Sequence, residues 1–365
     1  MFVSESMYEL GSKRSAIREL FEYGKKRAAI VGAENVYDFS LGNPTVPAPD
    51  CVNETIRELT QSLDSISLHG YTSAQGDLET RQAIADYLNN TYETNFKADN
   101  LYMTMGAAAS LSIAFKALTS SPDDEIIAIA PFFPEYRVFV TAAGAKFNVV
   151  APDTKNFQIN FDEFEKLVNK NTKAVIINSP NNPSGAVYSE QTIKKLADFL
   201  SKKSEEYGTH IFIITDEPYR EIVYDGVEVP YVTKYYNDTI VCYSYSKSLS
   251  LPGERIGFIL VPDEAYESKK LYAAVCGAGR ALGYVCDVNL YKKNRDLLYD
   301  GLTELGYECF KPDGAFYMFV KALESDAENF CEKAKEEDLL LVAATDFGCP
   351  GYVRISYCVD EDMIK

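Results

Sequence analysis

The sequence TIVCYSYSKSLSLPGERIGFILV, residues 239 to 261, joins two apolar runs through a short polar segment that contains one lysine. The first run, Thr239 to Tyr243, is rich in β-branched and aromatic residues, which is typical of a buried strand. The next residues are small and polar, and Pro252-Gly253 breaks the chain before the second apolar run. Lys247 is therefore predicted to lie just past the carboxyl end of a strand, where open α/β sheets bind ligands.

Six strand-like runs alternate with helical stretches between Glu125 and Val261. The runs are EIIAIA, AKFNVV, KAVIINS, HIFIIT, TIVCYS and RIGFILV, which begin at residues 125, 145, 173, 210, 239 and 255. Helical stretches such as Tyr136 to Ala143 and Ser189 to Tyr207 separate them. This alternation predicts an α/β fold in which a mainly parallel sheet is covered by helices on both faces.

A smaller α+β domain is predicted after residue 287. Its strand-like runs are GAFYMFVKA, LLLVAA and GYVRISYCV, and a helix is expected from Ala327 to Glu337. At the other end, the segment LGNPTVPAP, residues 41–49, contains a glycine and three prolines and marks a crossing between domains. We therefore predict a large domain of residues 47–287 and a small domain formed by residues 1–46 and 288–365.

Composition excludes several classes of function. Lys and Arg number 36 against 54 Asp and Glu, and this net charge of -18 argues against nucleic acids and anionic membranes as partners. No run of roughly eighteen apolar residues occurs and the first twenty residues are charged, so we expect a cytoplasmic protein. The eight cysteines form no C-x-x-C pair and only two histidines are present, which predicts reduced thiols and no metal site.

Two further strand-like runs end in polar loops. KAVIINSP is followed by Asn181-Asn182-Pro183-Ser184-Gly185, and HIFIIT is followed by Asp216-Glu217-Pro218-Tyr219. Together with Lys247 and Arg255, these loops bring an amide, an acid, a phenol, an amine and a guanidinium from successive strand ends. We expect the side chains to converge on one polar site. Those groups suit a pyridine ring that carries an aldehyde, a phenolate and a phosphate.

The combination of N-x-P-S-G, D-x-x-Y, S-x-S-K and Arg255 resembles the fold-type I pyridoxal-phosphate (PLP) aminotransferases of class I/II, the aspartate aminotransferase superfamily. The resemblance runs from about Tyr37 to Tyr357. It implies PLP as cofactor, amino acids and 2-oxo acids as substrates, a role in amino-acid metabolism and biosynthesis, and a homodimer. The stretch between Arg255 and Tyr291 is shorter than the family pattern, around Val285–Asp287, and relatives usually add a helix after Lys365.

The resemblance implies three catalytic residues. Lys247 would hold PLP as an imine and then move a proton between the substrate and the cofactor. Asp216 would pair with the pyridine nitrogen and keep it protonated. Tyr219, together with Asn182, would hydrogen-bond the ring oxygen O3′.

The cofactor phosphate is expected at a helix start. Small residues there let backbone N–H groups approach a phosphate, which points to Gly106, Ala107 and Ala108 in LYMTMGAAASLSIAFKAL, although tight packing alone also explains such residues. The resemblance adds Ser244, Ser246 and Arg255, and Tyr71 of the neighbouring subunit. It also places Phe133 in PFFPEY against the pyridine ring, with core packing as the competing interpretation.

Arg354 lies in the middle of the last strand-like run, between Val353 and Ile355. Its planar fork suits a carboxylate, and the resemblance places it on the substrate α-carboxylate, beside Asn182 and the backbone of Gly42. The alternative is an edge-strand arginine that faces solvent.

Transamination from aspartate to 2-oxoglutarate is the favoured reaction. A dicarboxylic substrate needs a second cation, for which Arg280 and Lys13 are weak candidates. Alanine or aromatic amino acids stay open as substrates, a C–S lyase is the alternative reaction, and a non-catalytic binding protein with the same fold is a third hypothesis.

Overall fold

The computed structural model describes residues 3–12, 16–37, 42, 44–70, 72–283, 292–309, 311 and 317–356. Its contacts divide the chain into two compact units, Met1–Gly283 and Tyr284–Lys365, which are described separately below. The sequence-based domain boundary at residue 287 falls outside the described residues. The assignment of residues 1–46 to the small domain stays a prediction.

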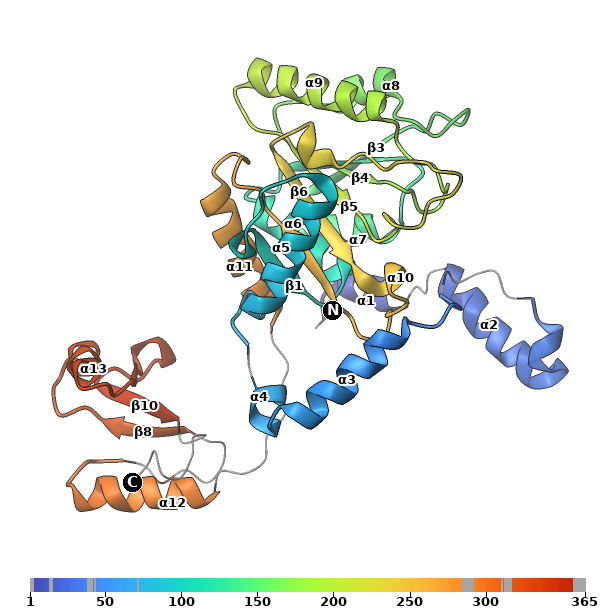
Figure 1. Cartoon of the computed structure of the whole chain (residues 1–365). Coiled ribbons are helices and arrows are strands. Elements are labelled where there is room, and N and C mark those ends of the chain that lie inside the picture. The colour runs from blue at the N-terminus through green and yellow to red at the C-terminus, as the bar shows by residue number, and fades with distance from the viewer. Residues whose placement is uncertain are drawn as a thin grey trace. The chain divides into compact units, whose positions relative to one another are not determined.

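A seven-stranded sheet forms the centre of the first unit (Figure 1). Its strands are β1 (Leu101–Thr104), β2 (Glu125–Ile129), β3 (Lys146–Val150), β4 (Thr172–Asn178), β5 (Phe212–Asp216), β6 (Thr239–Ser244) and β7 (Gly257–Leu260). Their order is β1-β7-β6-β5-β4-β2-β3, and β7 alone runs in the direction opposite to the other six strands. The predicted mainly parallel sheet is therefore confirmed.

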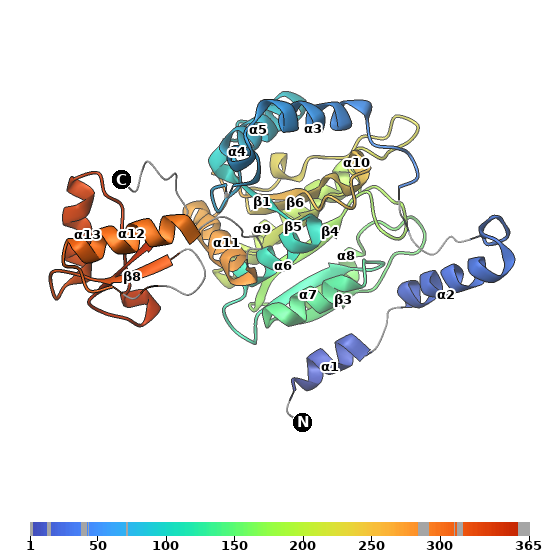
Figure 2. The same cartoon turned by 90° about the horizontal axis from the view of Figure 1, so that it is seen from below.

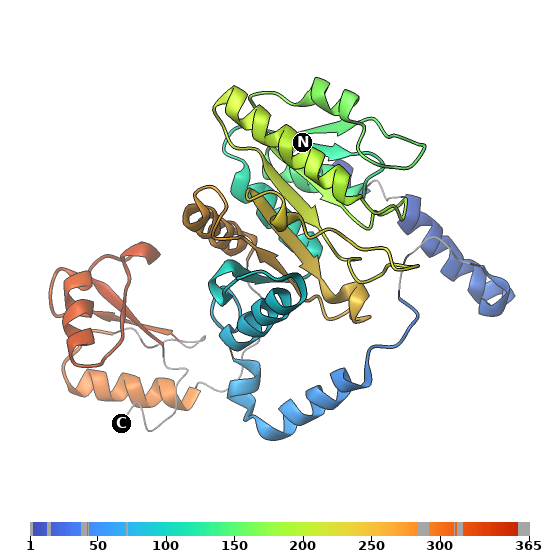
Figure 3. The same ribbon diagram turned by 45° about the horizontal axis from the view of Figure 1, so that its top comes forward.

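The helices of this unit lie before, between and after the strands. They are α1 (Glu5–Ser12), α2 (Ala16–Val31), α3 (Asp50–Ser62), α4 (Ser65–His69), α5 (Leu78–Tyr92), α6 (Ala107–Leu118), α7 (Glu135–Ala143), α8 (Phe161–Leu167), α9 (Glu190–Tyr207), α10 (Tyr245–Ser248) and α11 (Ser268–Leu282). Helices α6, α7 and α11 pack on one face of the sheet, and α5, α8 and α9 pack on the other. Figure 2, seen from below, shows α5 on one side of the strands and α6 and α7 on the other, and Figure 3 shows the same fold with its top turned forward.

The buried core explains why the strands read as continuous apolar runs. In β5, Ile213 contributes to the cluster under α8 and α9, whereas Ile214 contributes to the cluster under α6, α7 and α11. Both side chains are fully buried. A strand covered on both faces has no polar side, so its sequence does not alternate.

The strand directions bring the carboxyl ends of six strands, among them β1, β4, β5 and β6, to one edge of the sheet. Strands β4, β5 and β6 are parallel, and β7 is antiparallel both to β6 and to β1. Strand β1 consequently ends at the same edge as these three strands. This edge carries Thr104, Asn178, Asp216 and Ser244 as the last strand residues.

The described residues of the second unit form a three-stranded antiparallel sheet and two α-helices. Its elements are α12 (Lys292–Glu304), β8 (Tyr317–Lys321), α13 (Ala327–Glu336), β9 (Val342–Ala343) and β10 (Tyr352–Ser356). Met318, Val320 and Val353 form its buried core. Strand β10 pairs with β8 on one side and β9 on the other, so Arg354 lies on the central strand and the edge-strand alternative is wrong.

Candidate active site

Lys247 lies in the short helix α10, directly after the carboxyl end of β6, as the sequence predicts. Its side chain is half-buried, and Nζ donates a hydrogen bond to the carbonyl oxygen of Gly42 at 2.5 Å. Burial, and after it the nearby Arg255 guanidinium, lower the pKa of Lys247. A lysine with a lowered pKa is a better base and nucleophile at neutral pH.

Asp216 ends β5 and is 5% exposed. Its Oδ2 accepts a hydrogen bond from the Tyr136 hydroxyl at 2.5 Å, whereas its Oδ1 is buried with no partner among the described residues. Burial raises the pKa of Asp216 to about 7, and the hydrogen bond from Tyr136 opposes that shift. The carboxylate therefore has one oxygen open to a buried donor.

Asn178 fixes the loop that carries Asn182. The Asn178 side chain donates to the backbone carbonyl of Asp216 at 2.8 Å and accepts from the N–H of Asn182 at 2.6 Å. The Asn182 amide then reaches the Tyr219 hydroxyl at 3.4 Å. Burial, and after it the charge of Asp216, raise the pKa of Tyr219. The predicted amide, acid and phenol thus lie together.

Gly106 and Arg255 form a cup between β1 and α6. Gly106 is the N-cap of α6 with φ 81°, so the first N–H groups of the helix, at Ala107 and Ala108, face outward from its end. Arg255 Nη2 donates to the Met105 carbonyl at 3.2 Å, and a Cβ at Gly106 would lie 2.7 Å from that nitrogen. Helix N–H groups beside a guanidinium suit a phosphate.

The two predicted phosphate serines differ in place. The Ser244 hydroxyl accepts from the N–H of Ser246 at 3.2 Å, so Ser244 caps α10. Arg255 Nη1 contacts the Ser246 hydroxyl at 3.4 Å. Phe133 is partly buried and packs edge-on against Tyr136, with ring centroids 5.7 Å apart. One side of the Phe133 ring therefore packs in the core. Its contact with the pyridine ring stays a prediction.

The remaining predicted residues belong to other segments of the chain. Arg354 belongs to the second unit, where its guanidinium lies 4.3 Å from the Tyr317 ring centroid and 4.7 Å from that of Phe347. Its Nε is buried with no partner in the described part of the chain. Arg280 is exposed near the end of α11. Tyr71 and Lys13 lie outside the described residues.

Sequence reasoning missed Tyr136 and Asn178. The chain has 26 tyrosines, and nothing in PFFPEY distinguishes Tyr136 from the rest, because its partner Asp216 is 80 residues away. Asn178 carried a weak signal, since it is a polar residue at the end of an otherwise apolar run.

No group of three or more His, Cys, Asp or Glu side chains is arranged to hold a metal ion in the described ranges. No described helix has the length and apolar character needed to span a membrane.

The chain belongs to the class I and II aminotransferases, whose family model matches residues 34–278 and 287–365. It is therefore a transaminase that acts on amino-acid and oxo-acid substrates, and enzymes of this type use pyridoxal 5′-phosphate.

Similar proteins span almost the whole chain. Aspartate aminotransferase of Thermotoga maritima is 31% identical over 93% of this chain and 91% of its own length. A probable N-acetyl-LL-diaminopimelate aminotransferase of Bacillus subtilis is 30% identical over 91% of this chain and 87% of its own length. The crystal structure of an aminotransferase from Eubacterium rectale is 71% identical, covers 100% of this chain and 96% of its own, and superposes with a TM-score of 0.76.

The described residues fit PLP at both ends. The unpartnered Oδ1 of Asp216 suits the protonated nitrogen of the pyridine ring. The cup of Gly106, Ala107 and Arg255 suits the phosphate. Lys247 supplies an amine of lowered pKa for the aldehyde.

Proposed function

We propose that this transaminase moves the amino group of L-aspartate to 2-oxoglutarate through Lys247. The main support for this proposal is the buried carboxyl of Asp216, whose Oδ1 has no partner among the described residues. Asp216 lies at the same edge of the sheet as Lys247. The name of the Thermotoga maritima relative supports aspartate as the amino donor.

Each proposed role follows from what the residue contacts. When bound, PLP supplies an aldehyde for a covalent link and a ring that accepts electrons from the substrate α-carbon. Lys247, with its lowered pKa, carries the proton between that α-carbon and the cofactor carbon C4′. Asp216 holds a proton on the ring nitrogen. Tyr219 and Asn182 hydrogen-bond the ring oxygen O3′.

The phosphate and carboxylate contacts complete the proposal. Arg255, Ser246 and the N–H groups that follow Gly106 bind the phosphate, and Ser244 supports them by capping α10. The Arg354 guanidinium, which lies near two aromatic rings and has its Nε unpartnered in the described part, binds the substrate α-carboxylate. We also propose a cytoplasmic homodimer to which Tyr71 contributes across the interface.

Aromatic amino acids are the second candidate substrates. A cavity of about 400 Å³ adjoins Asn182 and Tyr219, and its other walls include Pro183, Ile222 and Val227. Those apolar walls suit a ring better than a carboxylate, because a buried carboxylate without a cation is costly. The differing names of the two relatives also leave the amino donor open.

A panel of amino acids tests the proposal. The purified enzyme with PLP and 2-oxoglutarate is expected to form glutamate fastest from aspartate. Faster turnover of alanine, tyrosine or phenylalanine would reject the aspartate assignment and leave transamination intact. Pyruvate released from cystathionine without glutamate would instead identify a C–S lyase. A lack of any cofactor absorbance change with every amino acid would indicate a non-catalytic protein.

A further inference from the structure

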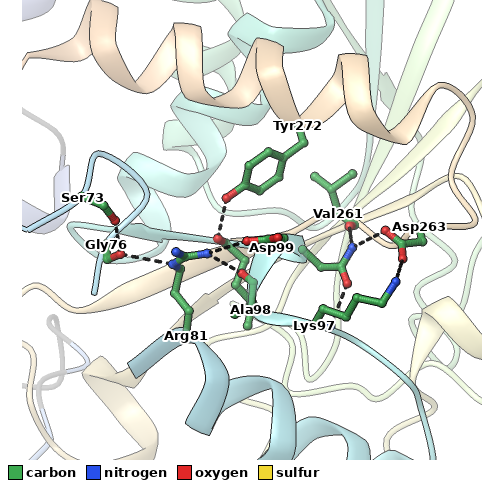
Figure 4. Close-up of polar contacts among 11 residues, drawn as sticks. Ser73, Gly76, Arg81, Lys97, Ala98, Asp99, Val261, Asp263 and Tyr272 are labelled. Carbon is green, nitrogen blue, oxygen red and sulfur yellow. Dashed lines mark hydrogen bonds and ion pairs between the residues drawn. The ribbon is translucent and has the colours of Figure 1, made fainter. Parts of the chain in front are cut away.

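Arg81 is a buried cation with backbone acceptors. It is the fourth residue of α5 and is 6% exposed. Its Nε donates to the Gly76 carbonyl at 3.2 Å, and its Nη1 donates to the Ala98 carbonyl at 2.7 Å (Figure 4). The nearest carboxylate, Asp99 Oδ1, is 3.5 Å away on a side chain that is 92% exposed. The guanidinium therefore serves chiefly to join two backbone segments.

One of those segments, Ser73–Gly76, lies directly against strand β1. The Met103 N–H donates to the Gln75 carbonyl at 2.8 Å, so the loop continues the hydrogen bonding of the sheet. Gly76 has φ +99°, and a Cβ there would lie 2.2 Å from Met103 Cγ. The Ser73 hydroxyl closes the loop by donating to the Gly76 carbonyl at 2.5 Å.

The start of β1 is tied to β7 and α11. The Asn100 amide donates to the Val261 carbonyl at 3.0 Å and to Asp263 at 2.8 Å. The Tyr272 hydroxyl donates to the Leu101 carbonyl at 2.8 Å (Figure 4). These contacts hold the first residues of the strand. Its second half pairs with β7 on one side and contacts the Ser73–Gly76 loop at Met103 on the other.

The second half of β1 leads into the phosphate cup. Two residues after Met103, the Met105 carbonyl accepts from Arg255 Nη2, and Gly106 then caps α6. We propose that Arg81 is a positioning residue for this cup. By holding Gly76 and Ala98, it fixes the loop that holds Met103 and so sets where Met105 and Gly106 meet the cofactor phosphate. This inference rests on the proposed phosphate site.

The experiment compares Arg81→Met and Arg81→Lys with Leu196→Ala in the full-length protein. Leu196 is fully buried in the core under α9, so its truncation destabilises the same unit away from the cup. Two quantities are measured: the PLP dissociation constant of the apoprotein by equilibrium dialysis, and the phosphorus NMR shift of bound PLP. Thermal unfolding of each apoprotein shows how far the variants are matched in stability.

Arg81→Met is expected to weaken PLP binding about tenfold, the order of loss seen when outer contacts around a bound group are removed, and to move the phosphorus shift. Arg81→Lys keeps the charge but has a single donor nitrogen, so it should do both to a smaller extent. This variant provides the test if the methionine variant does not fold. Leu196→Ala should change neither. Arg81 variants that match Leu196→Ala in both quantities would overturn the inference. If the wild-type protein bound no PLP, the cofactor assignment itself would be wrong.

Discussion

The two ends of the candidate site differ in how completely the described residues build them. At the ring end, Asp216 is enclosed, and Tyr136 and Asn178 hold its side chain and backbone. At the amine end, Lys247 is half-buried and contacts the Gly42 carbonyl, which belongs to the segment that crosses between the predicted domains. The ring end, at Asp216, is therefore positioned by one sheet and its helices. The amine end, at Lys247, also depends on a segment that is distant in the sequence.

This difference has an energetic side. A carboxyl whose pKa is raised to about 7 is destabilised as an anion by its burial. In the proposed site, the protonated ring nitrogen of the cofactor would place a positive charge beside Asp216. At neutral pH without the cofactor, ionisation of the buried Asp216 is therefore unfavourable. A cation bound beside Asp216 would offset the free-energy cost of that ionisation.

The largest effect is expected at the amine end. Lys247→Ala removes the covalent link and the proton carrier, so kcat/KM for transamination should fall about 10⁴-fold or more. The absorbance band of the lysine-bound cofactor should also disappear, while circular dichroism stays unchanged. Lys270→Ala, which removes an exposed lysine paired with Glu267 on α11, is the matched control. Residual activity within tenfold of the wild type would remove Lys247 from its proposed role.

The second prediction concerns the ring end and pH. The folded apoprotein keeps a proton on Asp216 up to about pH 7, whereas the unfolded chain loses it near pH 4. The contribution of Asp216 to the free energy of unfolding is therefore full below about pH 4 and is lost as pH rises to about 7. The total loss is about 4 kcal/mol.

Asp216→Asn should remove this loss, so the variant apoprotein is expected to be more stable than the wild type at pH 8. Urea unfolding at pH 5 and pH 8 measures the difference. Equal pH dependence of the two apoproteins would mean that Asp216 is not held as a buried acid, and the contrast between the two ends would then fail.

The third prediction tests the hydroxyl that supports Asp216. Tyr136→Phe leaves the charged Asp216 without its donor, which should cost about 2 kcal/mol of apoprotein stability at pH 8 and less at pH 5. Tyr188→Phe removes another buried hydroxyl, in the core under α9, and should show no such pH dependence. A Tyr136→Phe variant with the same loss at both pH values would contradict a specific contact with the carboxylate.

The smallest effect is expected at Asn182. Its amide contacts the Tyr219 hydroxyl at the long distance of 3.4 Å, so Asn182→Ala should cost about 1 kcal/mol in kcat/KM, or about fivefold. Steady-state kinetics with the preferred amino acid measures it. A loss as large as that of Lys247→Ala would show that the amine end is prepared as firmly as the ring end.

The sequence predicts local features of this protein better than pairings between distant ones. The apolar runs that become β4, β5 and β6 are visible because burial on both faces leaves no polar side. Asn182 follows β4, Asp216 ends β5 and Lys247 follows β6 in α10, so the place of the site follows from the same pattern.

Pairings between distant segments escape such reasoning. The strand order places β10 in the centre of its sheet, and nothing in GYVRISYCV reveals this. The contact of Tyr136 with Asp216 depends on how α7 packs on β5, which the spacing of apolar residues does not encode. The roles given to the site residues stay predictions, because they concern a ligand rather than the fold.

The Ser73–Gly76 loop has a second consequence, for self-association. Strand β1 is at one edge of the seven-stranded sheet, and a bare edge offers N–H and carbonyl groups to the strands of other molecules. The Gln75 carbonyl occupies the Met103 N–H and so closes part of that edge. The opposite edge, β3, instead carries Lys146, a charge that discourages strand pairing. Loosening the loop would therefore turn an ordered sheet edge into a starting point for aggregation.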